Sequence, residues 1–456
     1  MTKKPEAVET VAAHLAGVGI AALPDRITER IGDCILDTIA AAAAGVAAES
    51  SRAVISVSRA TFPGGPSTVW FSTDRRIPSA AAFSNGMAAT ALDIDDGHRR
   101  CAGHPGAAVV TAALATAEQV GATFGDLVIA VYCGYEAAVR AALSRNPAHN
   151  TSTASGRWSG IGAAAARAKL LGLDAPQFAQ AILIAENHGP RVAPAMLQGF
   201  SGAHVKEGIA WSIFTGMMAV DLAVEGFTGY PDTFDQDTLY NPLTLMANLG
   251  RGYAVDGLFF KPYACCRWIH AAIDALVQIT EDAECAWQDI VEIRVHTFER
   301  GVGLGNSPRP ITLEDAQFSV PFCLAVTAVR GTGDLKPMAT SVLQDDDILS
   351  FAKKVTVHFD DGINSRFPEF AGARVAVQTG TDVIERQVDA PFGDPTNPMV
   401  RSALQDKFRQ LAPMALSEDA AETIIAQCAM PVKTRTVPVS QLTAHLYYNS
   451  STATKT

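Results

Sequence analysis

The chain has 456 residues, of which 48% are hydrophobic and 18% charged, and its formal net charge is -11. This length exceeds what one hydrophobic core usually fills, so we expect a globular protein of two domains. The acidic balance, without any run of basic residues, excludes the electrostatic footprint of a nucleic-acid-binding protein.

The N-terminal segment and the cysteines bear on location. Residues 1–9 include Glu6 and Glu9 and contain no apolar core, so we expect no signal peptide. No stretch approaches a membrane span free of charge, and we expect no membrane partner. The eight cysteines follow no Cys-x-x-Cys spacing, and the adjacent Cys265 and Cys266 make a poor disulfide pair. We therefore expect a reduced, cytoplasmic protein.

The first half of the chain is rich in alanine and has the periodicity of helices. Apolar residues recur at three- and four-residue intervals over residues 27–44, 126–143, 163–171 and 205–224. Strand signals are nearly absent, and the small residues let helices approach one another closely. These patterns predict a large all-helical domain over residues 1–265.

Titratable side chains gather between residues 91 and 106. Asp93, Asp95 and Asp96 lie within a few positions of His98 and His104. Such neighbours perturb one another's pKa values, so a site for proton transfer is expected here. Two alternatives are a metal site and a structural role, in which Asp95 or Asp96 caps the next helix and His98 lies at the surface. No HxxxH or HExxH spacing supports a metal, and we expect none.

A glycine pattern at residues 160–165, Gly-Ile-Gly-Ala-Ala-Ala, has the form of a dinucleotide-binding loop. It follows the polar segment 155–159 rather than a hydrophobic strand, which the dinucleotide fold requires. We therefore expect no nucleotide cofactor.

Cationic side chains mark two further places. Lys206 precedes an apolar helical face, where a lysine either extends to water or binds a carboxylate. Lys261, Arg267 and His270 fall where the character of the sequence changes, and pockets favour domain interfaces. Cys266, beside Arg267, is a minor candidate for an activated thiolate, since a buried structural cysteine is commoner.

After residue 270 the sequence shows the alternation of apolar and polar residues that is typical of strands. Runs with a period of two cover residues 291–298, 354–359, 374–378 and 383–388, and helical patterns cover 269–279 and 317–329. Helical patterning returns from residue 397. We expect a smaller α+β lid domain over residues 266–396, inserted into a helical domain that residues 397–456 complete. The fold class is thus mainly α.

With these residues in view, the chain resembles the MmgE/PrpD family, which includes 2-methylcitrate dehydratase, cis-aconitate decarboxylase and iminodisuccinate epimerase. The resemblance spans nearly the whole chain, and the order and spacing of its motifs make it specific. The motifs are residues 91–96 with 104–106, 162–172, 205–206 with 226–229, and 260–263 with His270. The resemblance implies a large helical domain, a smaller α+β lid, a homodimer and no organic cofactor.

The resemblance also implies which residues act. Matches to the family's site between the two domains, which we expect to be catalytic, are Asp93, His104, Lys206 and His270. We add as candidates for substrate binding Asp96, His98, Arg157, Lys261, Tyr263 and Arg267. In this hypothesis His104, oriented by Asp93 or Asp96, transfers protons on one face of the substrate, and Lys206 or His270 does so on the other. The arginines and Lys261 would hold carboxylates and stabilise developing negative charge.

Two positions depart from the family's lyases. Thr153 stands where the lyases have a histidine and Phe322 where they have a tyrosine, and neither side chain relays protons near neutral pH. Losing an acid or base costs about two to four orders of magnitude in rate. Arg157 adds a guanidinium suited to further carboxylates. We therefore expect a cofactor-independent isomerase, an epimerase of a polycarboxylate such as iminodisuccinate. The alternatives are a lyase of 2-methylcitrate or cis-aconitate and a catalytically silent polycarboxylate-binding protein.

Overall fold

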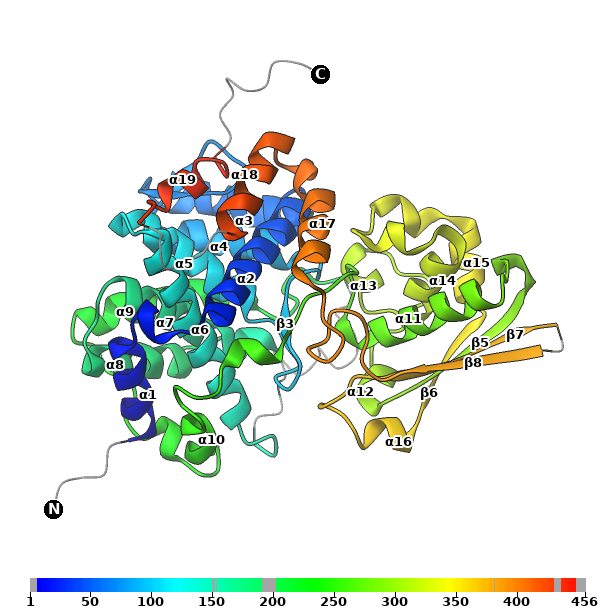
Figure 1. The fold of residues 1–456 in the computed structure, drawn as a ribbon, viewed down its shortest axis with the longest axis horizontal. Helices are drawn as coiled ribbons and strands as arrows, with labels where there is room; N and C mark the ends of the chain where they lie inside the picture. The colour runs from blue at the N-terminus through cyan, green and yellow to red at the C-terminus, as the bar shows by residue number, and fades with distance from the viewer. Residues whose placement is uncertain are drawn as a thin grey trace.

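The computed structural model describes residues 6–149, 152, 154–190, 202–380, 382–429 and 436–447. Figure 1 shows a large body of helices beside a smaller body that contains a sheet. The prediction of a mainly α chain with a smaller α+β domain is confirmed.

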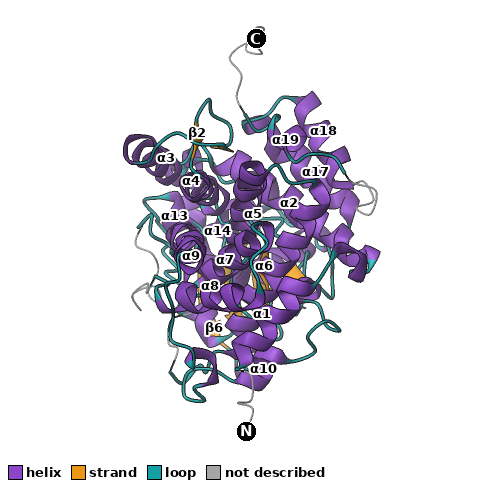
Figure 2. Cartoon of the chain, turned by 90° about the vertical axis from the view of Figure 1, so that its left-hand side faces the viewer, coloured by secondary structure: helices purple, strands orange, loops and turns teal. Residues whose placement is uncertain are grey.

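The large body is built from helices that surround one hydrophobic core. Its helices before residue 250 are α1 (Ala7–Gly17), α2 (Asp25–Gly45), α3 (Glu49–Thr61), α4 (Pro78–Thr90), α5 (Gly106–Val120), α6 (Phe124–Ser144), α7 (Ser159–Leu170), α8 (Ala175–Asn187), α9 (Ile209–Val224) and α10 (Pro242–Met246). Figure 2 shows α5, α6 and α7 running through its centre. The start of α6 is fixed by Thr123, whose hydroxyl accepts a hydrogen bond from the Asp126 amide.

The glycines of α7 serve helix packing. A Cβ on Gly216 of α9 would lie 2.1 Å from the carbonyl oxygen of Gly160, and one on Gly162 would lie 2.8 Å from that of Gly134 in α6. Only glycine permits such backbone contact. The Gly-x-Gly pattern at residues 160–165 therefore brings α7 close to its neighbours, and its position inside a helix is not that of a nucleotide-binding loop.

Among the described residues, α6 alone is long and apolar enough to cross a membrane as a single helix; α2 and α3 pass that test only when taken together, although they meet at 95°. In α6, 89% of the most apolar stretch is buried within the protein. That burial is typical of a core helix.

The smaller body has its own core, between a four-stranded sheet and the helices α11 and α14. Its elements are α11 (Arg267–Asp282), β5 (Ile290–Thr297), α12 (Glu299–Val302), α13 (Leu313–Ala316), α14 (Val320–Arg330), α15 (Asp346–Ala352), β6 (Val355–Phe359), α16 (Asp361–Asn364), β7 (Ala373–Thr379) and β8 (Asp382–Val388). The strand order is β6-β5-β7-β8, with β5 and β6 parallel and the other pairs antiparallel.

The chain then returns to the large body. Its last helices are α17 (Arg401–Leu411), α18 (Glu418–Ala429) and α19 (Ser440–Thr443). Helices α17 and α18 pack on α2, and Leu404 and Phe408 join the core of the helical body. The ammonium of Lys407 donates to Asp37 and to the carbonyl of Ile94. The end of the chain thereby supports the segment that carries Asp93 and Asp96.

Two helices begin later than their predicted first residues. The pattern over residues 205–224 predicts one helix, but α9 begins at Ile209, because Lys206 and Gly208 adopt left-handed backbone conformations in a preceding turn. The helix predicted over residues 317–329 is α14, which begins at Val320, three residues later. There the Ser319 hydroxyl accepts from the Phe322 amide and starts α14.

Candidate active site

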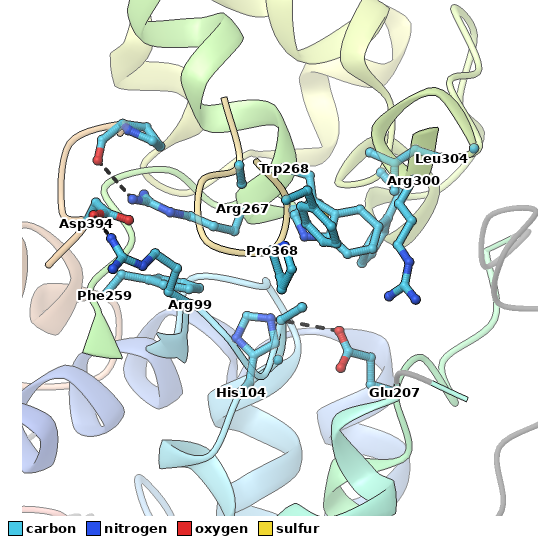
Figure 3. Close-up of a pocket in the computed structure, with 18 of the residues that line it drawn as sticks. Arg99, His104, Glu207, Phe259, Arg267, Trp268, Arg300, Leu304, Pro368 and Asp394 are labelled. Atoms are coloured by element: carbon cyan, nitrogen blue, oxygen red, sulfur yellow. Dashed lines mark hydrogen bonds and ion pairs between the residues drawn. The ribbon is translucent and has the colours of Figure 1, made fainter. Parts of the chain in front are cut away.

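A cavity of about 370 Å³ lies between the two bodies (Figure 3). The helical body contributes Arg99, His104 and Glu207, and the smaller body contributes Trp268 and Arg300. A second cavity of about 270 Å³ shares His104 and Glu207 with the first. This second space is also lined by Asp93, Asp95 and Lys206. The predicted acidic cluster therefore borders two adjoining spaces, which have His104 in common.

Two very short strands hold the acidic segment against the domain boundary. Strand β3 (Gly97–His98) pairs antiparallel with β4 (Leu258–Phe259), so Gly97 lies opposite Phe259. A Cβ on Gly97 would lie 2.3 Å from the Phe259 ring, which explains the glycine. The pairing brings residues 93–104 beside Lys261, which is more than 150 positions later in the sequence.

His104 is held with one ring nitrogen facing the cavity. Its backbone amide donates to the Ser155 hydroxyl at 2.9 Å, and its Nδ1 lies 2.7 Å from the Asp96 carbonyl oxygen. Because a carbonyl only accepts, Nδ1 carries a hydrogen. Nε2 is then the nitrogen that lies 3.5 Å from Asp93 Oδ1 and 3.8 Å from Glu207 Oε1, the latter drawn in Figure 3.

The surrounding charges favour the imidazolium form of His104. Burial by itself would lower the pKa of His104, but the carboxylates of Asp95, Glu207 and Asp93 outweigh it and raise the pKa. Burial likewise opposes the charge of Asp93, yet Lys261 and the other nearby cations lower its pKa. A protonated imidazole beside an ionised carboxylate is an arrangement suited to proton donation.

Two lysines supply positive charge behind Asp93. The ammonium of Lys261 is buried 3.1 Å from Asp93 Oδ2, and Asp93 and Asp95 together raise its pKa against the opposing effect of burial. The ammonium of Lys206 donates to the carbonyl oxygens of Thr90 and Ala91 and to Gln317 of the smaller body. Lys206 therefore ties the two bodies together at the site.

Three of the seven non-glycine residues with positive φ in the described part of the chain lie around the same groups. Asp93, Ala102 and Lys206 all have positive φ, at 53°, 51° and 43°. Non-glycine residues in this region cost about 1–3 kcal/mol each, and they cluster at functional sites. Asp93 and Lys206, which both have this backbone conformation, line the same smaller cavity. Neither is a glycine, so the sequence does not predict these conformations.

Asp96 anchors the acidic segment to the helices α5 and α6. Its Oδ1 accepts from the Gly106 amide at 2.9 Å and its Oδ2 from the Tyr135 hydroxyl at 2.6 Å. A Cβ on Gly106 would lie 2.4 Å from Asp96 Oδ1. Burial, together with the nearby Asp37 carboxylate, raises the pKa of Asp96 to about 7. Asp96 is thus a positioning residue at the start of α5.

The raised pKa of Asp96 makes stability depend on pH. Its ordinary value is 3.8, so this carboxyl stabilises the fold fully below about pH 4 and loses that contribution as pH rises through about 7. We expect Asp96→Asn to flatten the fall in unfolding free energy between about pH 5 and 8, by on the order of 3 kcal/mol. Urea titrations at several pH values measure this slope, and parallel profiles for the two proteins would contradict the assignment.

Six of the candidates lie outside the lining of these two cavities: Asp96 and Lys261, described above, and four others. His98 accepts from the Cys101 amide, and burial lowers its pKa to about 3. The guanidinium of Arg157 donates to Glu186 at 2.5 Å. His270 is fully buried, with Nε2 3.1 Å from the Cys265 carbonyl oxygen, and burial holds its pKa well below the ordinary value. The Tyr263 hydroxyl donates to Asp274. Each of the four is engaged by its own neighbours.

Arg267 does line the larger cavity, but its guanidinium serves the fold. It donates to the carbonyl oxygens of Phe392 and Pro391 at 2.8 and 2.9 Å. Cys266 lines the same cavity, and burial raises its thiol pKa, so it is no thiolate.

Of the two positions that depart from the lyases, the structure describes only Phe322. Thr153 lies outside the described residues. Phe322 is fully buried near the start of α14, in the core of the smaller body, and carries no hydroxyl.

Asp93, Asp95 and His104 form a group whose possible ligand atoms lie within 4.8 Å of one another. The Lys261 ammonium, 3.1 Å from Asp93, already supplies a positive charge at that group. A cation of fixed charge at this distance repels a metal ion, so the donor set fits an ammonium better.

Glu207, Trp268 and Arg300 line the site although the sequence did not single them out. Glu207 could have been noticed only as the neighbour of Lys206, and it is fixed by the Ser155 amide, which donates to its Oε2 at 2.9 Å. Trp268 and Arg300 belong to segments whose patterns indicate only helices and loops.

A helical body and an α+β body that enclose a buried His-Asp-Lys cluster define the class of protein. Two sequence-family models match the chain, the MmgE/PrpD N-terminal domain over residues 9–246 and the MmgE/PrpD C-terminal domain over residues 263–430. The chain therefore belongs to the MmgE/PrpD family.

Curated relatives of this chain are named cis-aconitate decarboxylases. The one from Homo sapiens is 26% identical over 443 residues, covering 91% of this chain and 90% of the relative. The one from Mus musculus is 26% identical, covering 91% and 89%. One from Aspergillus terreus is 24% identical, covering 88% of each chain. Family members of this kind are enzymes, and the names of these relatives denote a lyase activity.

Proposed function

We propose that this chain is a lyase that decarboxylates a polycarboxylic acid of the cis-aconitate type. The observation that carries the proposal is His104, with Nε2 facing the cavity between two carboxylates that raise its pKa. The names of the relatives support the same reaction class. The substrate is a small polycarboxylate.

The reaction needs little more than these side chains. When the carbon–carboxylate bond breaks, CO₂ departs and the electron pair remains on carbon, in conjugation with another carboxylate. The positive charges of Lys206 and Lys261 stabilise the developing negative charge. The His104 imidazolium then donates its proton to carbon and is reprotonated from water. One proton is consumed for each CO₂ released, and no organic cofactor is required for this balance.

The test is incubation of the purified protein with cis-aconitate in deuterated water. We expect CO₂ release together with one deuterium at carbon in the product, seen by NMR. If the protein releases no CO₂ and the product carries no carbon-bound deuterium, the proposal is wrong. A thermal shift with cis-aconitate but no turnover would instead support a silent binding protein.

Epimerisation of a tetracarboxylate such as iminodisuccinate is the second candidate. Phe322 favours it, because this buried side chain lacks the hydroxyl that the resemblance assigns to the lyases. Lys206 and His104 both border the smaller cavity, so a proton taken by one group can be returned by the other. A single stereoisomer incubated in deuterated water would lose optical rotation and gain α-deuterium without releasing CO₂. Retention of both rotation and α-hydrogen would contradict this alternative.

We also propose that two copies of the chain associate through an apolar patch formed by Val205 and Trp211. These side chains are 67% and 52% exposed, and the Trp211 ring stacks on Phe214. The patch borders the smaller cavity, so a second copy would cover a space that reaches the catalytic groups.

Trp211→Glu is expected to convert the dimer to monomer at micromolar concentration, because a buried unpaired charge opposes association. Light scattering after size exclusion measures the mass. Leu243→Glu, an exposed apolar position on α10, is the control. Equal masses for the wild type and Trp211→Glu would contradict the assignment of this patch.

A further inference from the structure

Three arginines line the cavity between the two bodies: Arg99, Arg267 and Arg300. Arg99 reaches from the helical body to Asp394 at 3.0 Å and Glu369 at 2.8 Å. Arg267 is occupied by the carbonyl oxygens of residues 391 and 392. Both guanidinium groups therefore hold the loops of the smaller body in place.

Arg300 is different. Within the described ranges, no carboxylate oxygen lies within 4.0 Å of its guanidinium. The guanidinium carbon lies 5.8 Å from the centroid of the Phe367 ring. The segments outside those ranges contain no aspartate or glutamate side chain. No side-chain carboxylate of this chain therefore occupies the Arg300 guanidinium, which is available to a ligand in the cavity.

The position of Arg300 suits a ligand that spans the cavity. Arg300 stands on α12 of the smaller body, and Figure 3 shows it extending toward the helical body on the side of Glu207. Trp268 and Leu304 flank it with apolar surface. His104 lies across the cavity, on the helical body. A guanidinium partly shielded from water binds a carboxylate through two parallel hydrogen bonds more strongly than an exposed one does.

We propose that Arg300 binds the substrate carboxylate that lies farthest from the reacting carbon. A polycarboxylate then bridges the two bodies, with its reacting carbon at His104 and its remote carboxylate at Arg300. This inference rests on the proposed function, since it assigns a carboxylate of the proposed substrate. It makes the smaller body the part of the chain that selects substrates by the number and spacing of their carboxylates.

The test uses tricarballylate, a saturated tricarboxylate, as an unreactive probe. Calorimetry with the full chain is expected to give 10- to 100-fold weaker binding for Arg300→Gln than for the wild type. Arg300→Lys, which keeps the charge but loses the paired geometry, should fall between them. Methylsuccinate, in which one terminal carboxylate of tricarballylate is replaced by hydrogen, should bind the wild type and Arg300→Gln equally. Arg309→Gln, an exposed arginine of the same body that does not line the cavity, should bind tricarballylate as the wild type does.

Each contrary result has a distinct meaning. Equal binding of tricarballylate by wild type and Arg300→Gln, no binding by the wild type, or equal weakening in Arg309→Gln would overturn the role of Arg300. If those results occur while the wild type still releases CO₂ from cis-aconitate, the proposed function stands without this inference. If Arg300→Gln weakens tricarballylate binding as expected but no CO₂ is released, the carboxylate site stands and the decarboxylase proposal fails.

Discussion

Replacing His104 with asparagine is expected to lower kcat by about 10²- to 10⁴-fold while the protein remains folded. The asparagine amide can still donate to the Asp96 carbonyl oxygen as Nδ1 does, so the loop keeps its anchor. It offers no group at the position of Nε2, which faces Asp93 and Glu207. Steady-state CO₂ release from cis-aconitate measures kcat, and circular dichroism confirms the fold.

The pH dependence of the wild type gives a second measure of the same group. A general acid is active while protonated, and the carboxylates raise the pKa of His104 above its ordinary value of 6.5. We therefore expect kcat to fall as pH rises through that raised pKa, and His104→Asn to lose this dependence. His358→Asn, an exposed histidine on β6, should keep both the rate and the profile. A wild-type rate that increases with pH would argue instead for His104 as a base.

Replacing Lys261 with methionine is expected to lower the free energy of unfolding by about 3–5 kcal/mol. The Lys261 side chain is fully buried and that of Asp93 is only 5% exposed, so the change leaves a carboxylate in a poorly solvated site without its closest cation. The pKa of Asp93, now lowered mainly by Lys261, should rise. Urea unfolding at neutral pH measures the loss of stability.

The double variant Lys261→Met with Asp93→Asn separates stability from catalysis. Removing both charges should restore most of the lost stability, because a buried neutral pair carries no unpaired charge. Activity should remain low, since the positive charge that stabilises the reacting carbon is gone. If Lys261→Met lowers the free energy of unfolding by less than about 1 kcal/mol, the ion pair contributes little to the stability of the fold.

The helices and strands follow largely from local sequence patterns. Alternation over residues 374–378 and 383–388 predicted β7 and β8, and apolar periodicity over residues 27–44 and 126–143 predicted α2 and α6 to within a few residues. Such periodicity reflects which side of an element faces the core. The same reasoning failed at residues 317–319, because the Ser319 hydroxyl accepts a hydrogen bond from the Phe322 amide and α14 begins three residues later than predicted.

The sequence by itself determined that chemistry would gather at residues 93–104, because carboxylates and imidazoles so close together must interact. Only the tertiary structure decided which of them share a cavity. Asp96 and His98 lie in the same few residues as His104, yet the first anchors α5 and the second is a buried neutral ring beside β4. Lys261 comes beside the acidic segment through the pairing of β3 with β4, and Arg300 lines the cavity from the smaller body. Both placements depend on side-chain packing between distant segments, and such packing leaves no periodic pattern in the sequence.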